Sequence, residues 1–367
     1  MTDTIDARDR LVYTYDELMR DHEYARPHVV GGQRMHGGFL DDGTYQPPRA
    51  LVREAALDAW TRSLRARGGD LLDADATLLG GVRLPTVEQS RVLLRHGLGE
   101  TFWNSLTITG KIEARGRLLA EIEFPDLQPH IVDDIAEMAI GHLSTGLLYA
   151  HGIDEGGQPD LGIGGHDVMW FVARDLAFGA GAYPDVDPPE NIARPEAGQR
   201  FLPEVPAAIE GLLSLLANLL IIEFRAEIGF AATQAVLRTP DLFVDRRAEA
   251  EEAAEIVGRI RADEEIHVRS LRVYLGELAH VRFRTVDGGE IAGAELISRF
   301  WDGLVQWATV DQPRLAAEQQ RLLIEERIAS HPDAARVRAE FDAAASLAAP
   351  VAAGLGRRTV RWTDCCS

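Results

Sequence analysis

The stretch "RIRADEEIHVRSL", residues 259–271, places acids and a histidine inside an otherwise apolar helical pattern. At 3.6 residues per turn, Glu264 and His267 fall on the stripe of the surrounding aliphatic residues, whereas Glu265 points elsewhere. The aliphatic members of this stripe are Ile256, Ile260, Leu271, Leu275 and Leu278. Glu264 and His267, three residues apart, leave one helix face together and can bind one metal ion. Asp263 and His267, four apart, form an equally feasible pair, and an ion pair between Glu264 and a nearby arginine is the metal-free alternative.

Two further acids lie in the most apolar segment, "GLLSLLANLLIIEFRAEIGFAA", residues 211–232. Glu223 and Glu227 are four residues apart, so both leave the same face of a helix. A buried carboxylate is costly unless it is protonated, paired or bound to a cation, and two on one face also repel each other. A divalent cation removes both penalties, which favours a metal site, and pairing with arginines is the alternative.

His142 and Glu113 supply the next candidates. In "IVDDIAEMAIGHLSTGLLYAH", His142 shares an inward stripe with apolar residues, where a core histidine without metal is the alternative. Glu137 is five residues before His142, on the wrong side of a regular helix, and needs a π-bulge to join it. Glu113, in "TGKIEARGRLL", is near the middle of its predicted helix, and a solvated glutamate is equally compatible with its flanking pattern.

Five other acids and histidines lie at a predicted helix start or in a predicted loop. His166 and Asp167 stand at the helix start, where Asp167 is expected to be the N-cap. His151, Asp154 and Glu155 lie in the glycine-containing stretch "HGIDEGGQPDLGIGGHD", which we expect to be a loop. These three residues can line the mouth of a pocket, but we expect them to be exposed.

Composition narrows the classes of protein. The 367 residues carry a formal net charge of −20, which argues against nucleic-acid and anionic-membrane partners. The two cysteines, Cys365 and Cys366, are adjacent near the C-terminus, so no thiolate is available for a metal site inside the domain. The apolar run at 212–222 is shorter than the roughly 20 residues that span a bilayer. We therefore expect a cytoplasmic protein with no membrane partner.

Helical periodicity dominates the chain and predicts an all-α fold. We expect four long helices at about 99–124, 130–151, 206–237 and 245–281, with one long crossover between the second and third. The expected organisation is an N-terminal helical and loop extension (1–95), a metal-binding helical bundle (96–284), C-terminal helices packing on the bundle (285–350) and a tail (351–367). Residues 26–49 are expected to be a loop, and "FRTVDGGEI" a turn or small hairpin.

Across about 100–280 the chain resembles the ferritin-like di-iron carboxylate superfamily, in which two helices each give a Glu and two others each give a Glu-x-x-His. The resemblance implies a ferritin-like bundle with metal ligands Glu113, His142, Glu223, Glu227, Glu264 and His267. The residue three before His142 is Ala139, so Glu227 or Glu137 has to replace the missing carboxylate. The Asp263–His267 spacing is also similar to that of the heme-oxygenase-like di-iron oxidases, with Asp263 as a ligand or a partner of a ligating histidine.

The resemblance implies an oxidoreductase that holds two iron ions, or one, with manganese as a substitute, and activates O2 to oxidise or oxygenate a small organic substrate. A reductant is a further partner of such chemistry, and a homodimer is compatible with the sequence. Two other functions stay open. One is a non-enzymatic helical structural or interaction protein whose inward glutamates pair with arginines, and the other is a zinc- or manganese-dependent hydrolase at the same ligands.

Overall fold

The computed structural model describes residues 10–80, 84–190, 192–194 and 199–346. Within these residues the protein is mostly helical, as predicted, and the predicted tail at 351–367 lies outside them. Five helices surround the candidate site: α4 (Glu100–Gly116), α5 (Leu148–Gly156), α6 (His166–Phe178), α7 (Ala207–Leu237) and α8 (Arg247–His280). The remaining helices are α1 (Tyr15–Leu18), α2 (Ala50–Ala66), α3 (Val87–Arg95), α9 (Gly293–Gln306), α10 (Gln312–Ala329) and α11 (Ala334–Ala345).

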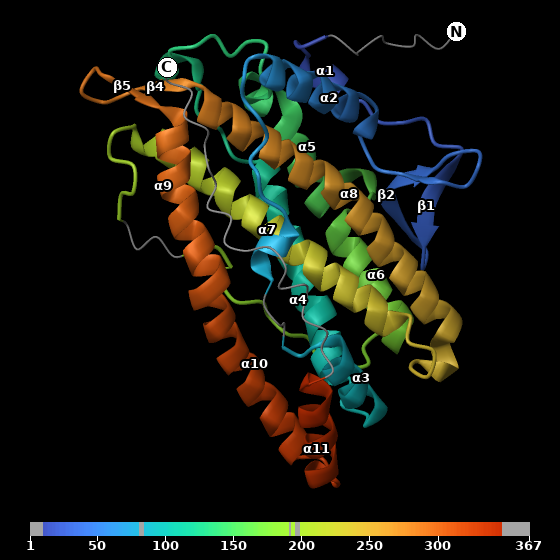
Figure 1. The fold of residues 1–367 in the computed structure, drawn as a ribbon. Coiled ribbons are helices and arrows are strands. Elements are labelled where there is room, and N and C mark those ends of the chain that lie inside the picture. The colour runs from blue at the N-terminus through green and yellow to red at the C-terminus, as the bar shows by residue number, and fades with distance from the viewer. Residues whose placement is uncertain (1–9, 81–83, 191, 195–198, 347–367) are drawn as a thin grey trace.

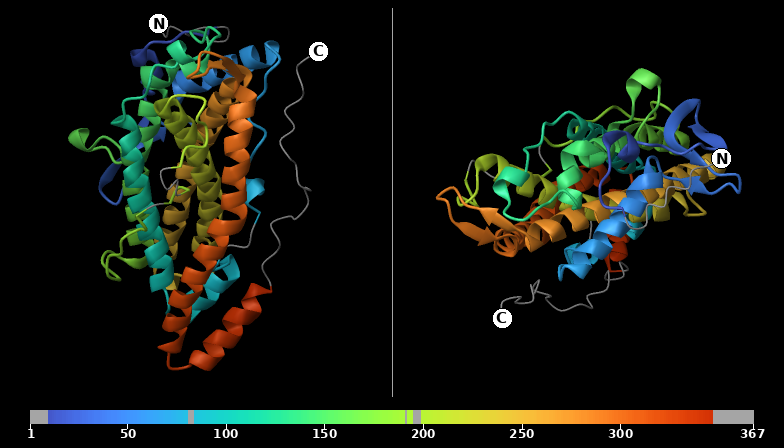
Figure 2. Two further views of the ribbon diagram at one scale, coloured as in Figure 1. Left: turned by 90° about the vertical axis from the view of Figure 1, so that its left-hand side faces the viewer. Right: turned by 90° about the horizontal axis from the view of Figure 1, so that it is seen from above.

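The two long helices α7 and α8 run antiparallel and pack against each other, while α6 packs against both α4 and α8 (Figures 1 and 2). Their bounds agree with the prediction to within two residues at each end. The stripe predicted for α8 is confirmed, since Ile256, Ile260, Glu264, His267 and the three leucines that follow are buried and Glu265 is exposed. Figure 1 also shows α9 and α10 running along the molecule to α11 at one end.

The prediction of a helix at 130–151 is wrong. Residues 139–142 form a 3₁₀ turn and Leu143–Leu147 a π-helical turn, and the regular helix α5 begins only at Leu148. Gly146 has φ of 136°, which is incompatible with a helix and available at little cost only to glycine. This irregular segment shifts the register of everything after it, so His142 and the residues of α5 do not share one helix face.

The N-terminal segment expected to be a loop forms a three-stranded antiparallel sheet. Strand β1 (Arg26–Val30) pairs with β2 (Gln33–Phe39), which pairs with β3 (Tyr45–Gln46). Gly31 and Gly32 join the first two strands with φ of 60° and 77°, the backbone that a type I′ hairpin turn requires. Gly164, just before α6, bonds to both Arg34 and His36 of β2, so the sheet is attached beside that helix.

Later segments match the prediction more closely. "FRTVDGGEI" lies within the hairpin of β4 (Arg282–Arg284) and β5 (Glu290–Ala292), and the expected C-terminal helices are confirmed as α9, α10 and α11. The helix expected at about 99–124 is shorter than predicted, because α4 ends at Gly116 and a 3₁₀ turn follows at Arg117–Ala120. Gly110 lies inside α4, where an added Cβ would stand 2.8 Å from the Phe171 ring.

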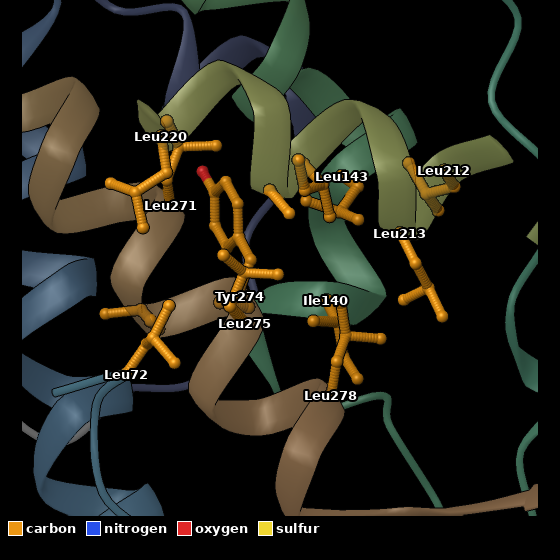
Figure 3. Packing of buried hydrophobic residues seen from close by; sticks show 14 of the residues in the cluster. Leu72, Ile140, Leu143, Leu212, Leu213, Leu220, Leu271, Tyr274, Leu275 and Leu278 are labelled. Carbon is orange, nitrogen blue, oxygen red and sulfur yellow. The ribbon is translucent and has the colours of Figure 1, made fainter. Parts of the chain in front are cut away.

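The described residues form three buried apolar clusters, and α8 contributes to the two larger ones. Ile256 and Ile260 belong to one cluster, whereas Leu271 and Leu275 belong to the other. Figure 3 shows the second cluster, with the Tyr274 ring between α7 and α8. The polar residues between Ile260 and Leu271 therefore lie where the two clusters meet.

Helix α7 is long and apolar enough to cross a membrane by length and composition, with a mean hydropathy of 1.8 over its most apolar window. In this structure 67% of that window is buried inside the protein, and the core helix of a soluble protein meets the same criterion. The apolar run at 212–222 is thus one part of a longer, mostly buried helix.

Glu277 on α8 provides a test of this packing by pH. Its side chain is buried, accepts a hydrogen bond from the Ile140 N–H at 3.0 Å, and has its pKa raised by burial from 4.5 to about 7. Between these two values the folded chain holds a proton that the unfolded chain has lost, so the free energy of unfolding falls as pH rises, by roughly 3 kcal/mol in total. Glu277→Gln should therefore become more stable relative to the wild type at about pH 8 than at about pH 5 in urea unfolding.

The control is Glu265→Gln, an exposed position on the same helix. Its stability relative to the wild type should not change between the two pH values. An equal response of both variants would show that the buried Glu277 carboxyl is not the source of the pH dependence.

Candidate metal centre

Seven buried side chains from five helices converge in the interior, and none is more than 8% exposed. Four are glutamates and three are histidines, and we call them the carboxylate–histidine cluster. Its members are Glu113 of α4, His151 and Glu155 of α5, His166 of α6, Glu223 of α7, and Glu264 and His267 of α8.

The cluster consists of two overlapping groups. The first is His151, Glu155, Glu223 and His267, and the second is Glu113, Glu155, His166 and Glu264. In each group one potential ligand atom from every residue lies within 4.8 Å of the others, a spacing that allows a metal ion between them. Glu155 belongs to both groups.

Glu264 also faces both groups. Its Oε2 is 2.7 Å from the Nδ1 of His267, and its Oε1 is 3.2 Å from the Nδ1 of His166. Similarly, Glu155 has Oε1 3.4 Å from His267 and Oε2 3.7 Å from His166. Two carboxylates are thus placed where they can bridge two ions.

Two imidazole nitrogens in the cluster are buried and have no hydrogen-bond partner among the described residues. The Nε2 of His151 is 3.1 Å from Glu223 and 3.3 Å from Glu155, but without hydrogen-bond geometry to either. The Nδ1 of His166 is likewise unpaired, although carboxylate oxygens of Glu264 and Glu113 lie 3.2 and 3.5 Å away. Buried polar atoms normally have a partner, so nitrogens aimed between carboxylates indicate a site for a cation.

A second layer of charged residues holds His267. Its Nε2 is 3.2 Å from the Oδ2 of Asp154, and that carboxylate also forms ion pairs with Arg49 and Arg53. Burial raises the pKa of Asp154, but the two guanidinium groups outweigh this and keep the pKa well below its ordinary value. A permanent carboxylate at Nε2 leaves Nδ1 of His267 facing the cluster, the usual arrangement of metal-binding histidines.

Asp263 does the same for His166. Its Oδ2 is 3.2 Å from the Nε2 of His166, 3.0 Å from the Nε2 of His36, and accepts a hydrogen bond from the Tyr45 hydroxyl at 3.0 Å. Burial raises the pKa of Asp263, yet hydrogen bonds from the two histidines lower it below the ordinary value. His36, His166 and Asp263 are close enough to form a further potential ligand group, but Asp263 already fixes the orientation of His166.

Two glutamates of the cluster have raised pKa values, so they keep protons that isolated glutamates would lose. Burial, together with the nearby Glu155 carboxylate, raises the pKa of Glu113 well above its ordinary value. Burial and the Glu264 carboxylate do the same to the pKa of Glu223. Both effects disfavour charge, so the negative groups of this interior need positive compensation.

The histidines provide part of that compensation. Burial lowers the pKa of His166 and of His267, but the Glu264 carboxylate outweighs burial, raising the first well above its ordinary value and the second to about 9. Conversely, burial and Glu155 raise the pKa of Glu264, while both histidines lower it to a net value of about 2. Protonated histidines therefore supply positive charge that a metal ion could supply instead.

Glycines bring these elements close together. An added Cβ at Gly116 of α4 would stand 2.5 Å from the Cγ of Glu155, and one at Gly152 of α5 would stand 2.5 Å from the backbone of Ala120. At Gly165 it would lie 2.5 Å from the carbonyl oxygen of Glu155, so only glycine lets the start of α6 come near enough to place His166 in the cluster. The predicted loop is therefore confirmed at 157–165 but wrong at 151–156, which belong to α5, and Gly152 and Gly165 also serve as close packing contacts.

Four of the expected ligands lie in the cluster: Glu113, Glu223, Glu264 and His267. Asp263 lies next to it and contacts a cluster histidine, which is the arrangement expected if it orients a ligand.

The other expected ligands lie elsewhere. His142 is buried with its ring 5.2 Å from the Trp60 ring, in the irregular segment before α5. Glu227 forms an ion pair with Arg261 at 2.6 Å and is half-exposed. Glu137 is exposed and lies outside any helix.

His151, Glu155 and His166 are cluster members that the sequence did not predict, because the glycines around them indicate a loop and His166 adjoins an expected cap. The available signal is the His151–Glu155 spacing of four, which places both on one helix face. The expected cap is wrong, since α6 begins at His166 and its N-cap residue is Gly165.

No family model, curated protein or solved structure matches this chain. Its function has to be inferred from the arrangement of its own residues.

Gly116 allows a test of the close packing at Glu155. Gly116→Ala should lower the free energy of unfolding by about 1–3 kcal/mol, because its Cβ would overlap the Glu155 side chain. The matched control is Gly211→Ala in α7, where an added Cβ meets nothing within 4 Å. This variant should gain about 0.5–1 kcal/mol from the better helix propensity of alanine. Chemical denaturation measures both, and equal effects of the two substitutions would contradict the packing role of Gly116.

Proposed function

We propose that the carboxylate–histidine cluster binds two transition-metal ions, iron or a manganese–iron pair, and that the protein uses them with O2 to oxidise a small organic substrate. The observation that carries this proposal is the burial of four glutamates that have only histidines as ion-pair partners. Among the described residues, no arginine or lysine forms an ion pair with any of the four. Two divalent ions would supply the four positive charges that four carboxylates require.

The donor set suits such metals. It contains only carboxylate oxygens and imidazole nitrogens, which favour iron, manganese and zinc over ions that need thiolates. The unpaired nitrogens of His151 and His166 fit the same interpretation, because each lacks a hydrogen-bond partner among the described residues. When bound by a carboxylate-rich set, iron supplies the electrons and open binding positions with which O2 is activated.

The residues of the cluster would have different roles in binding the metal ions. Glu155 and Glu264 lie between the two groups and would bridge, while Glu113 and Glu223 would each complete one group. In the metal-bound protein Asp154 would accept the Nε2–H of His267 and so leave Nδ1 free to bind the ion. The apolar clusters on either side exclude water and strengthen these electrostatic contacts.

We also infer a relationship to the ferritin-like di-iron carboxylate proteins. Supporting it are the packing of α4, α6, α7 and α8, the long connection between α6 and α7, and Glu264-x-x-His267. The chain departs from the usual pattern on α5, where His151 and Glu155 are four residues apart, and in drawing a ligand from α6.

Metal identity separates this proposal from its two alternatives. A structural protein with neutralised acids would contain no metal, and a hydrolase would contain redox-inert zinc at full occupancy. Iron, with an optical spectrum typical of a carboxylate-bridged pair, would support the oxidase.

Glu223 and Glu227 form a matched pair for this test, since they are one turn apart on α7. Protein purified without chelator should contain about two metal ions per chain by elemental analysis. Glu223→Gln should lose at least one of them, because it removes a charged ligand from the first group. Glu227→Gln should keep both, because Glu227 is paired with Arg261 outside the cluster. Equal metal content in all three proteins would contradict the assignment.

Metal affinity should rise with pH. The metal-free cluster holds protons on Glu113, Glu223 and His166, whose pKa values are raised, and a metal ion must displace them to bind. The dissociation constant for Mn²⁺ should therefore fall between about pH 6 and 8, with protons released on binding. Calorimetry in buffers of different ionisation enthalpy measures the release, and a dissociation constant independent of pH would contradict displacement.

A further inference from the structure

A cavity of about 440 Å³ lies beside the N-terminal sheet, next to the metal centre but outside it. Its walls include His36 of β2 and Arg49, just before α2. Each of these residues contacts one of the two aspartates that hold a cluster histidine: His36 contacts Asp263, and Arg49 contacts Asp154. One layer of side chains therefore separates the cavity from the residues that orient the metal ligands.

The cavity walls carry buried polar atoms with no partner. The Nδ1 of His36 and the Nε of Arg49 make no hydrogen bond among the described residues, although the two side chains are only 4% and 3% exposed. The Nε2 of His22, also on the wall, is unpaired as well. Such atoms are rare in folded proteins, and here three of them belong to residues that line one cavity.

The charge of the cavity favours an anion. Arg34 and Arg49 line it, and within the described chain the Arg34 guanidinium has no ion pair. Asp21 is the one carboxylate among the described lining residues, and its Oδ1 already accepts hydrogen bonds from the Tyr24 hydroxyl and the Arg49 N–H. Guanidinium groups bind carboxylates through paired N–H donors.

The remaining wall suits the organic part of such a ligand. Tyr24, Pro27 and Ile163 contribute apolar surface beside the two arginines. Small-molecule sites typically combine an apolar lining with a few placed polar groups.

We propose that this cavity binds a small organic monocarboxylate, with its carboxylate on Arg34 and Arg49 and its apolar part against Tyr24 and Ile163. This binding does not require a metal.

Three acids and their primary amides probe the site: benzoate, phenylacetate and octanoate against benzamide, phenylacetamide and octanamide. Calorimetry on the full chain, both metal-free and loaded with Fe²⁺ without oxygen, measures each affinity. At least one acid should bind about tenfold more tightly than its amide, because only the acid offers a charged partner to the arginines. Binding of no acid, or equal binding of acid and amide, would overturn the proposal.

Arg34→Gln tests the position of the carboxylate, since Arg34 is exposed and its replacement should leave the fold intact. It should weaken binding of the acid about tenfold or more, without changing the metal content. The control is Arg26→Gln on neighbouring β1, where the guanidinium lies over the Phe39 ring and not in the cavity. This variant should bind the acid as the wild type does, and an unchanged affinity in Arg34→Gln would refute the assignment.

The two proposals can fail separately. If an acid binds as described but the protein holds no metal, the cavity site stands and the oxidase proposal falls. If metal binds at the cluster but no acid binds in the cavity, the carboxylate proposal alone is overturned.

Discussion

Negative charge in an apolar interior is the constraint on which the rest of this structure depends. Four glutamates that would each prefer water are held between two hydrophobic clusters, among histidines and away from the many arginines of the surface. Such a group of carboxylates is tolerated only with positive compensation, from protons or from metal ions. The raised pKa values of Glu113, Glu223 and His166 show how strongly these side chains demand it.

Other features serve this centre from a distance. Asp154, held by two arginines, and Asp263, held by His36 and the Tyr45 hydroxyl, orient the two histidines whose Nδ1 atoms face the glutamates. The N-terminal sheet therefore contributes to the site, although α2 and α3 separate its strands from α4 in the sequence. The sheet is held beside the site by Gly164, immediately before α6, which forms backbone hydrogen bonds with β2.

Much of the fold could be predicted from the sequence, because long amphipathic helices carry a strong periodic signal. The inward position of Glu264 and His267 followed from their place on an aliphatic stripe, and that of Glu223 from its apolar helix. Glu227 shows the limit of this reasoning, since one turn of helix is enough to move it from the interior to an ion pair with Arg261. Periodicity indicates a face but not where that face meets another helix.

The remaining errors have a common origin in glycine. In the sequence Gly152 and Gly165 indicate a loop, whereas in the structure they allow backbones to approach closely and so place His151, Glu155 and His166 in the cluster. Gly146 has the opposite effect, since its φ of 136° separates the segment that carries His142 from α5. A single sequence does not distinguish a glycine that bends the chain from one that lets two helices touch.

The order of the ligands along the chain has a consequence for biosynthesis. A ribosome releases Glu113, His151, Glu155 and His166 well before α8, yet each ligand group needs a residue of α8 to be complete. If the cluster binds metal as proposed, tight capture of an ion has to wait until nearly the whole bundle has emerged and docked. Until then the nascent chain carries a half-built set of acids and imidazoles, open to whichever cation the cell offers first.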